Sequence, residues 1–167
     1  MNIETLNALP EEELRTQLSH CCGSTYWVNG MIQKRPFTSV QDLHLQADKI
    51  WAASTEADWL EAFTHHPKIG DIGSLRLKFA ATATWASGEQ QGVQQASDAV
   101  LTALAEGNDL YETKFGFIFI VCATGKSAAE MLELLQARLS NSRSQELVIA
   151  RDEQHKITHI RLDKLMV

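Results

Sequence analysis

The chain has 167 residues, of which 44% are hydrophobic and 22% are charged, a composition that excludes disordered, collagen-like and low-complexity classes. Lys and Arg number 15 against 21 Asp and Glu, so the net charge is −6 at pH 7. Because there is no basic field or local basic run, we expect no nucleic-acid partner. A chain of this length buries one sizeable core and carries no Pro/Gly/Ser-rich linker, so we predict a single domain over residues 1–167.

The sequence also indicates a compartment. No apolar run approaches the ~20 residues that cross a bilayer, and residues 1–4 lack the basic and apolar regions of a secretory leader. Cys21 and Cys22 are adjacent and Cys122 is the third cysteine, an arrangement that matches neither a CxxC metal pair nor a disulfide framework. We therefore expect a reduced, cytoplasmic protein without a membrane partner.

Helix start signals occur three times before residue 67. Pro10 followed by glutamates at 11–13 is typical of a first helical turn, because proline lacks an N–H that would be unsatisfied there and carboxylates favour the positive end of the helix dipole. Two capping pairs predict two further helices. These pairs are Ser39 with Asp42 and Thr55 with Asp58. The proline and two glycines of residues 67–73 then predict a turn.

The rest of the chain is also predicted to be helical. The Ala- and Gln-rich ranges 74–86 and 88–106 predict two helices, the second ending at Gly107 and Asn108. Ser127 with Glu130 forms a capping box ahead of another helix, and residues 143–165 follow a broadly helical pattern. The aromatic and β-branched run 115–122 has strand propensity but no partner strand. We predict a buried helix or an extended core segment there, inside an all-α protein.

Two local patterns suggest ligands but are incomplete. Residues 124–127 resemble the end of a P-loop, yet Ile120 stands where that loop needs a glycine, so a turn and an N-cap account for them. His155 and His159 would share one helix face, as zinc-binding pairs do, but no third ligand lies at a familiar spacing. We interpret these two histidines as a solvated surface pair.

His66 is the strongest acid–base candidate from the residues alone. It closes a predicted helix before Pro67 and a glycine-bearing loop, and imidazole gives and takes protons near neutral pH. Taken singly, however, a histidine at a helix end is more often a cap or core residue. Glu89 and Gln90 stand where a helix start favours carboxylates, and Arg161 alone is typical of a surface arginine.

Together these segments form an ordered pattern. It consists of His-Pro-Lys-Ile-Gly at 66–70, Glu-Gln at 89–90, Phe-Gly-Phe at 115–117, residues 119–123 and residues 156–162. In that order and at those separations the chain resembles the 2-oxo-4-hydroxy-4-carboxy-5-ureidoimidazoline (OHCU) decarboxylases. Further matches at 35–37, 138–141 and 146–147 extend the resemblance over nearly the whole chain.

The resemblance implies a compact, single-domain, all-helical fold, commonly a homodimer, that acts in urate breakdown. Enzymes of this family decarboxylate OHCU to (S)-allantoin and use no metal or organic cofactor. His66 matches the family's catalytic histidine, and Glu89 is expected to act with it. The residues expected to contact the substrate are Pro67, Ala86, Ser87, Gly88, Glu89, Gln90, Phe119, Ile120, Val121, Cys122, Ala123 and Arg161.

One departure from the family pattern leaves alternatives open. A serine common three residues before the family's glutamate is Ala86 here, and although Ser87 is adjacent, a one-residue shift on a helix turns the hydroxyl by ~100°. A non-catalytic helical ligand-binding module of the same fold is therefore one alternative. A metal-dependent hydrolase built on the chain's paired histidines is the other. Its residues would be His65, His66, His155 and His159.

Overall fold

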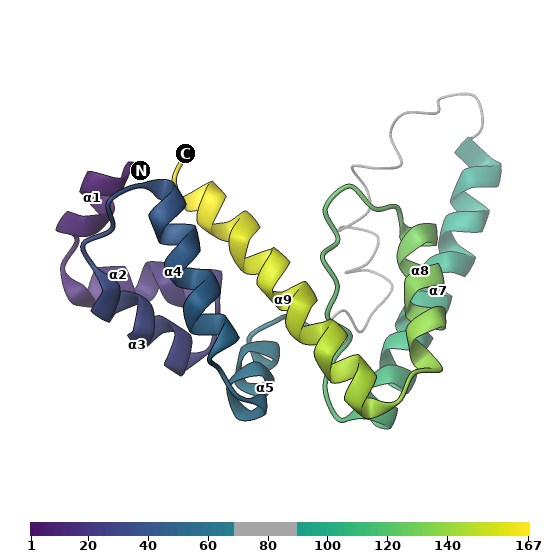
Figure 1. Cartoon of the computed structure of the whole chain (residues 1–167). Helices are drawn as coiled ribbons and strands as arrows, with labels where there is room; N and C mark the ends of the chain where they lie inside the picture. The colour runs from purple at the N-terminus through teal and green to yellow at the C-terminus, as the bar shows by residue number, and fades with distance from the viewer. Residues whose placement is uncertain (69–89) are drawn as a thin grey trace. The chain divides into compact units, whose positions relative to one another are not determined.

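The computed structural model describes residues 1–68 and 90–167, with side chains at 1–68 and 98–167 (Figure 1). The described residues form helices and no strand, which confirms the all-α prediction. No helix in this part of the chain is long and apolar enough to cross a membrane. The helices are α1 (Ile3–Ala8), α2 (Glu11–Cys21), α3 (Thr25–Lys34), α4 (Val40–Ala52), α5 (Glu56–Thr64), α7 (Gln90–Phe115), α8 (Ala128–Leu139) and α9 (Arg143–Leu165).

The chain forms two compact units, residues 1–66 with 147–167 and residues 67–146. The first unit, from here on unit 1, contains α1 to α5 and α9 from Leu147 onward. Its core is built on fully buried side chains such as Leu14, Leu18 and Trp27. The amino group of Met1 donates to the carbonyl of Leu165 at 2.8 Å, so the two ends of the chain meet in this unit (Figure 1). The prediction of one domain over residues 1–167 stays a prediction.

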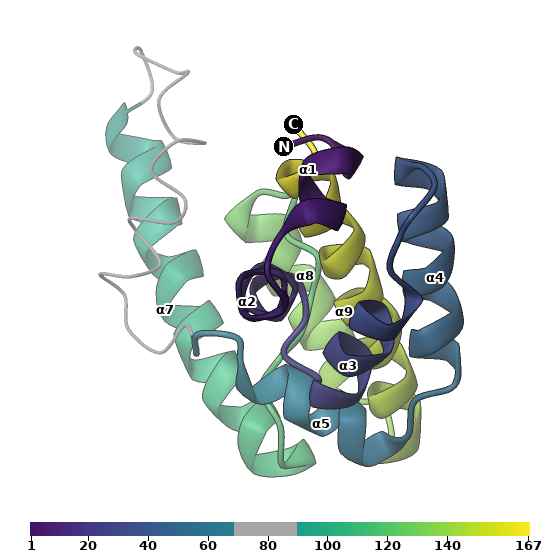
Figure 2. The same ribbon diagram turned by 90° about the vertical axis from the view of Figure 1, so that its left-hand side faces the viewer.

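The helix starts predicted in unit 1 are confirmed. Helix α2 begins directly after Pro10, and Leu14, Leu18 and Cys21 on it are buried. The Ser39 hydroxyl accepts from the Asp42 N–H at 3.0 Å at the start of α4. At the start of α5 the Thr55 N–H donates to the Asp58 carboxylate at 2.8 Å. Helix α4 lies alongside the C-terminal part of α9 (Figures 1 and 2).

The second unit, unit 2, is dominated by α7 and α8, which pack against each other and run in the same direction (Figure 1). A connection between two parallel helices must return along their length, and extended backbone covers about twice the distance per residue that a helix does. Residues 116–127 make this return without helix or strand. Of the two alternatives predicted for 115–122, the extended segment is therefore correct for residues 116–122, whereas Phe115 is the last residue of α7. Phe117, Ile120 and Cys122 are buried.

The predicted end of α7 at Gly107 and Asn108 is wrong, because the helix continues to Phe115. Gly107 is an interior position where α8 comes close: a Cβ added there would lie 2.6 Å from Leu135 Cδ2. The helix instead ends at Gly116, whose φ of 82° is left-handed and whose N–H donates to the Glu112 carbonyl at 2.9 Å. The helix predicted at 74–86 and most of the turn at 67–73 lie outside the described residues.

Candidate active site

His66 lies just beyond α5, where the chain leaves the helix. Its N–H donates to the Phe63 carbonyl at 3.2 Å, and its side chain is half-buried. The ring is directed at α9, where His66 Nε2 lies 2.5 Å from the amide oxygen of Gln154. The structure therefore gives the predicted acid–base residue a fixed partner that the sequence did not indicate.

The hydrogen bonds around Gln154 determine which ring nitrogen of His66 carries a proton. The Thr158 hydroxyl donates to the Gln154 backbone carbonyl at 3.1 Å, so it accepts from the Gln154 side-chain NH₂ at 3.2 Å. That bond directs the Gln154 side-chain oxygen, which only accepts, toward His66. His66 Nε2 must then be the donor, and the neutral ring is the Nε2–H tautomer.

Gln154 and Thr158 belong to a polar stripe on α9 that also includes Arg161. Their spacing of four and three residues places them on one helix face. Gln154 and Thr158 are buried, at 0% and 2% exposure, although both are polar. Arg161 donates to the carbonyls of His20 and Cys21, at 3.3 and 3.5 Å, at the C-terminus of α2. The arginine thus satisfies helix-end carbonyls rather than only extending along the surface.

Burial dominates the chemistry of the two cysteines at this end of α2. It raises the pKa of both Cys21 and Cys22 to about 11, and the nearby guanidinium of Arg161 lowers it only in part. Both side chains are almost fully enclosed and neither is in a disulfide. These thiols stay protonated at neutral pH and are core residues.

Residues 119–123, the predicted substrate-contacting segment of unit 2, are held by Arg138. Its guanidinium donates to the Ile120 carbonyl at 2.7 Å and lies over the Phe119 ring, 4.5 Å from the centroid. Lys126 donates to the Cys122 carbonyl at 2.9 Å. The backbone of this segment is therefore fixed from two sides.

Arg138 is itself part of a buried network in unit 2. Its Nε pairs with Glu146 Oε1 at 2.6 Å, and the Tyr111 hydroxyl donates to that same oxygen at 2.5 Å. Asn141 donates to the other Glu146 oxygen at 2.9 Å. Burial, followed by the hydrogen bond to Glu146, raises the pKa of Tyr111. The matches at 138–141 and 146–147 thus include the residues of a structural network.

The P-loop-like residues 124–127 have the structure expected of a turn and an N-cap. Gly125 has a left-handed φ of 74°, and the Ser127 hydroxyl accepts from the Glu130 N–H at 3.2 Å at the start of α8. The lysine amine is already bound to a backbone carbonyl. These contacts explain the Thr-Gly-Lys-Ser run without a nucleotide.

Other predicted site residues are described only in part. Pro67 is exposed. Gln90 is the first residue of α7, and its side chain lies outside the described residues. The residues predicted at 86–89, which include Ala86, Ser87, Gly88 and Glu89, lie wholly outside them.

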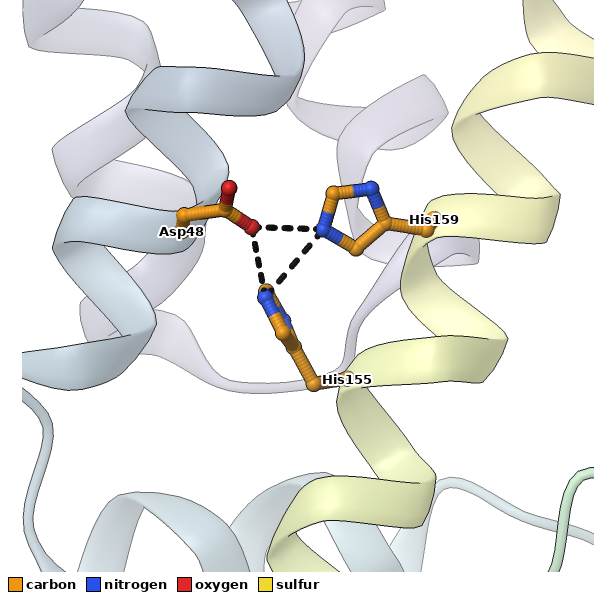
Figure 3. A group of neighbouring side chains, drawn as sticks. All are labelled: Asp48, His155 and His159. Carbon is orange, nitrogen blue, oxygen red and sulfur yellow. Dashed lines mark hydrogen bonds and ion pairs between the residues drawn. The ribbon is translucent and has the colours of Figure 1, made fainter.

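The interpretation of His155 and His159 as a solvated surface pair is corrected by the structure (Figure 3). The Nε2 atoms of His155 and His159 lie 2.7 and 2.6 Å from Asp48 Oδ1 on α4, and 3.1 Å from each other. The third group that the sequence spacing did not supply comes from 107 residues away. Sequence reasoning missed Asp48 because only the packing of α4 on α9 brings it to the histidines.

Burial and hydrogen bonding shift the pKa values of His155 and Asp48. Burial lowers the pKa of His155, opposed in part by Asp48. Burial also acts on Asp48, in the raising direction, but the hydrogen bonds from His159 and His155 outweigh it and the net pKa of Asp48 is lowered. Among the described residues, Asp48, His155 and His159 form a group of side chains that could hold a metal ion. His66 is not part of this group.

Comparisons with known proteins agree on one family. The sequence model of the OHCU decarboxylase family matches residues 7–163. The chain belongs to the OHCU decarboxylase family. Its relatives are carboxy-lyases and bifunctional proteins of uric acid degradation.

Individual relatives cover the chain almost completely. A crystal structure described as OHCU decarboxylase in the presence of (S)-allantoin has 38% sequence identity and a TM-score of 0.73, covering 95% of this chain and 99% of that chain. The Arabidopsis thaliana uric acid degradation bifunctional protein TTL is 40% identical over 87% of this chain, which spans only 45% of that protein. The OHCU decarboxylase of Xenopus laevis is 27% identical, with 100% and 95% of the two chains covered.

Proposed function

We propose that this protein decarboxylates OHCU to (S)-allantoin in urate degradation. The observation that carries the proposal is the family pattern along residues 7–163, with a histidine at position 66 held by a neutral amide on α9. The structure described as solved in the presence of (S)-allantoin supports the choice of product.

The reaction needs little from the protein beyond orientation and one proton. When the bond between the ring carbon and the carboxylate breaks, its electron pair moves into the conjugated C=N and carbonyl groups of the substrate. Carbon dioxide leaves and an enol forms. The hydroxyl-bearing carbon that carried the carboxylate becomes a ring carbonyl when the hydroxyl proton is lost, and the adjacent, ureido-bearing carbon takes a proton. Because the substrate accepts its own electrons, we propose that no organic cofactor or metal takes part.

His66 is the proposed acid–base residue. Its Nε2 proton is bonded to Gln154, which holds the ring in one orientation for proton exchange with the substrate. The ring is half-buried, within reach of a ligand, and its orientation is fixed by a partner that carries no charge. His66 would take the hydroxyl proton of the substrate and then protonate one face of the resulting carbanion or enol, which sets the chirality of allantoin.

The remaining proposed contacts fix the substrate. Glu89 and Gln90 would bind the ureido and ring N–H groups, and the Arg161 guanidinium would pair with an anionic or carbonyl oxygen. The backbone of residues 119–123 would contact the flat ring, and Pro67 and Ser87 would complete the contacts. A backbone segment suits this task because Arg138 and Lys126 hold its carbonyls in place. We also propose a homodimer in the cytoplasm, which light scattering and fractionation would test.

Product chirality tests the reaction. OHCU generated in situ by urate oxidase and hydroxyisourate hydrolase decays by itself to racemic allantoin, so circular dichroism separates catalysis from decay. We expect the protein to produce one enantiomer rapidly, with or without EDTA. Loss of stereospecific product in EDTA would refute the cofactor-free reaction and favour the metal-dependent alternative. Slow racemic product would support the non-catalytic module and point to the Ala86 departure.

Substituting His66 tests the mechanism. His66→Ala should lower turnover by about 10²–10⁴-fold, the usual contribution of general acid–base catalysis. His65→Ala is the matched control, since His65 is the exposed neighbouring residue, and it should retain near-normal turnover. Equal activity in the two variants would remove His66 from the mechanism.

A further inference from the structure

The trio of Asp48, His155 and His159 belongs to a longer chain of contacts between α4 and α9. His159 Nδ1 lies 2.6 Å from His44 Nδ1, with the two ring planes 10° from parallel. His44 Nε2 lies 2.8 Å from Asp163 Oδ1. The order of contacts is therefore Asp163, His44, His159, Asp48, and all four residues belong to unit 1.

Counting protons shows that neutral histidines cannot satisfy this chain by hydrogen bonds alone. Each of its three contacts needs one proton between its heavy atoms, because carboxylate oxygens only accept. Two neutral imidazoles, His44 and His159, supply two protons. Moreover, if both His155 and His159 donate to Asp48 Oδ1, their two N–H groups face each other across 3.1 Å.

A divalent cation removes both problems. We propose that Asp48 Oδ1 and the Nε2 atoms of His155 and His159 bind a divalent transition-metal ion of the zinc class. His159 Nε2 then gives its lone pair to the metal, and its Nδ1–H donates to His44 Nδ1. The His44 Nε2–H donates to Asp163. Each contact of the chain from Asp163 to Asp48 is then satisfied by neutral rings and ionised carboxylates, and His44 and Asp163 are the outer partners that fix His159. The Nδ1 atom of His155 is buried and has no hydrogen-bond partner among the described residues.

The geometry and surroundings suit such an ion. The three ligand atoms are 2.6, 2.7 and 3.1 Å apart, and all face one point (Figure 3). Ligands on a tetrahedral zinc with bonds of about 2.0–2.1 Å lie roughly 3.4 Å apart, so binding widens the triangle by less than about 1 Å. The side chains of His155, His159 and Asp48 are 24%, 29% and 48% exposed, which leaves a fourth position open to water. The carboxylates of Asp48 and Asp163, at the two ends of the chain of contacts, also favour a cation there.

The bound metal would link α4 to α9. A ligand that binds only the folded protein raises its unfolding temperature. The site is independent of the proposed decarboxylation, because none of its residues is assigned a part in that reaction. Its failure and that of the proposed function can therefore be told apart.

Metal titration of the untagged, EDTA-stripped protein tests this site. Calorimetry with Zn²⁺ should show one ion per chain, and Zn²⁺ should raise the unfolding temperature by several degrees. Co²⁺ should give the visible absorption bands of a four-coordinate site. His155→Gln and Asp48→Asn should each weaken Zn²⁺ binding by 100-fold or more. His20→Gln, a histidine change on α2 away from the trio, is the matched control and should leave binding unchanged.

The outer partner separates a built site from nonspecific binding. His44→Leu keeps all three ligands but should weaken Zn²⁺ binding by about 10–100-fold, as loss of an outer-shell partner does. A wild-type protein that does not bind Zn²⁺, or variants at Asp48 and His155 that bind it as tightly as wild type, would overturn the proposal. The unfolding temperature of each stripped variant shows whether it is folded. Decarboxylation that depends on the added metal would instead refute the cofactor-free reaction and leave the site in place.

Discussion

The molecule contains two buried polar assemblies that are built on different principles. In unit 2, Arg138 and Glu146 form a charged pair at 8% and 0% side-chain exposure, and Tyr111 and Asn141 complete the hydrogen bonds of Glu146. In unit 1, the chain from His66 through Gln154 to Thr158 uses neutral amide and hydroxyl groups and ends at a half-buried imidazole.

The difference follows from what each assembly must hold. In a buried ion pair, moving or removing either charge leaves the other without compensation, so both partners are held in place. This suits an arginine that fixes the backbone of residues 119–123. A neutral partner fixes the position and tautomer of an imidazole without adding a charge of its own beside the ring.

Removing one charge from the unit 2 network should have the largest effect. Arg138→Met leaves the Glu146 carboxylate buried without its cation, so we expect the free energy of unfolding to fall by about 3–5 kcal/mol in urea denaturation. The Ile120 carbonyl also loses its donor, so activity should fall together with stability.

The double variant Arg138→Met, Glu146→Leu distinguishes the lost charge from lost packing. With neither charge buried, it should recover much of the stability that Arg138→Met loses. A double variant at least as unstable as Arg138→Met would mean that shape, rather than charge compensation, accounts for the loss.

Local signals explain how much of the fold could be predicted. The caps at Ser39, Thr55 and Ser127 each involve residues three positions apart, so short-range spacing was enough to place those helix starts. The end of α7 could not be read in this way. Gly107 resembles a stop signal, but its function is to let Leu135 approach, a contact made across 28 residues of chain that only tertiary packing creates.

The residues of the candidate site also separate into those with a local sequence signal and those that only tertiary packing brings together. His66 and Arg161 were predicted from an ordered pattern of short motifs, which needs no three-dimensional information. Gln154 was missed because a glutamine in a helix carries no signal of its own, although its spacing to Thr158 and Arg161 marks one helix face. Asp48 was missed because it meets His155 across 107 residues of sequence.

Replacing Gln154 tests whether the neutral partner positions His66. Gln154→Leu removes the acceptor of the Nε2 proton, and the loss of one such hydrogen bond, ~1.4 kcal/mol, should lower kcat by about tenfold. KM should change less, because Gln154 is not among the proposed substrate contacts. Steady-state kinetics followed by circular dichroism would measure both constants.

Gln154→Glu is the matched variant, since it keeps the acceptor but adds a charge. A carboxylate beside the ring stabilises the imidazolium, so the acidic limb of the kcat/KM profile should move to higher pH. Unchanged pH profiles in both variants would show that Gln154 serves packing alone.

The smallest effect is expected at the cysteines, one pair in unit 1 and a single residue in unit 2. The pKa of Cys21 and of Cys22 is raised to about 11 by burial, so at pH 8 neither forms an appreciable fraction of thiolate. Because an unfolded thiol ionises near pH 8.5, the folded state keeps these protons up to a higher pH than the unfolded state does. Their contribution to stability is full below that pH and is lost as pH rises toward about 11.

Labelling of the native protein with Ellman's reagent at pH 8 measures this. Cys122→Ser retains only the unit 1 pair, and we expect it to react far more slowly folded than in guanidinium, where both thiols should react at once. The converse variant, Cys21→Ala with Cys22→Ala, retains only Cys122, so its labelling rate measures how accessible that thiol is. Rapid labelling of the folded Cys122→Ser variant would show that the end of α2 opens, and with it the carbonyls that Arg161 contacts.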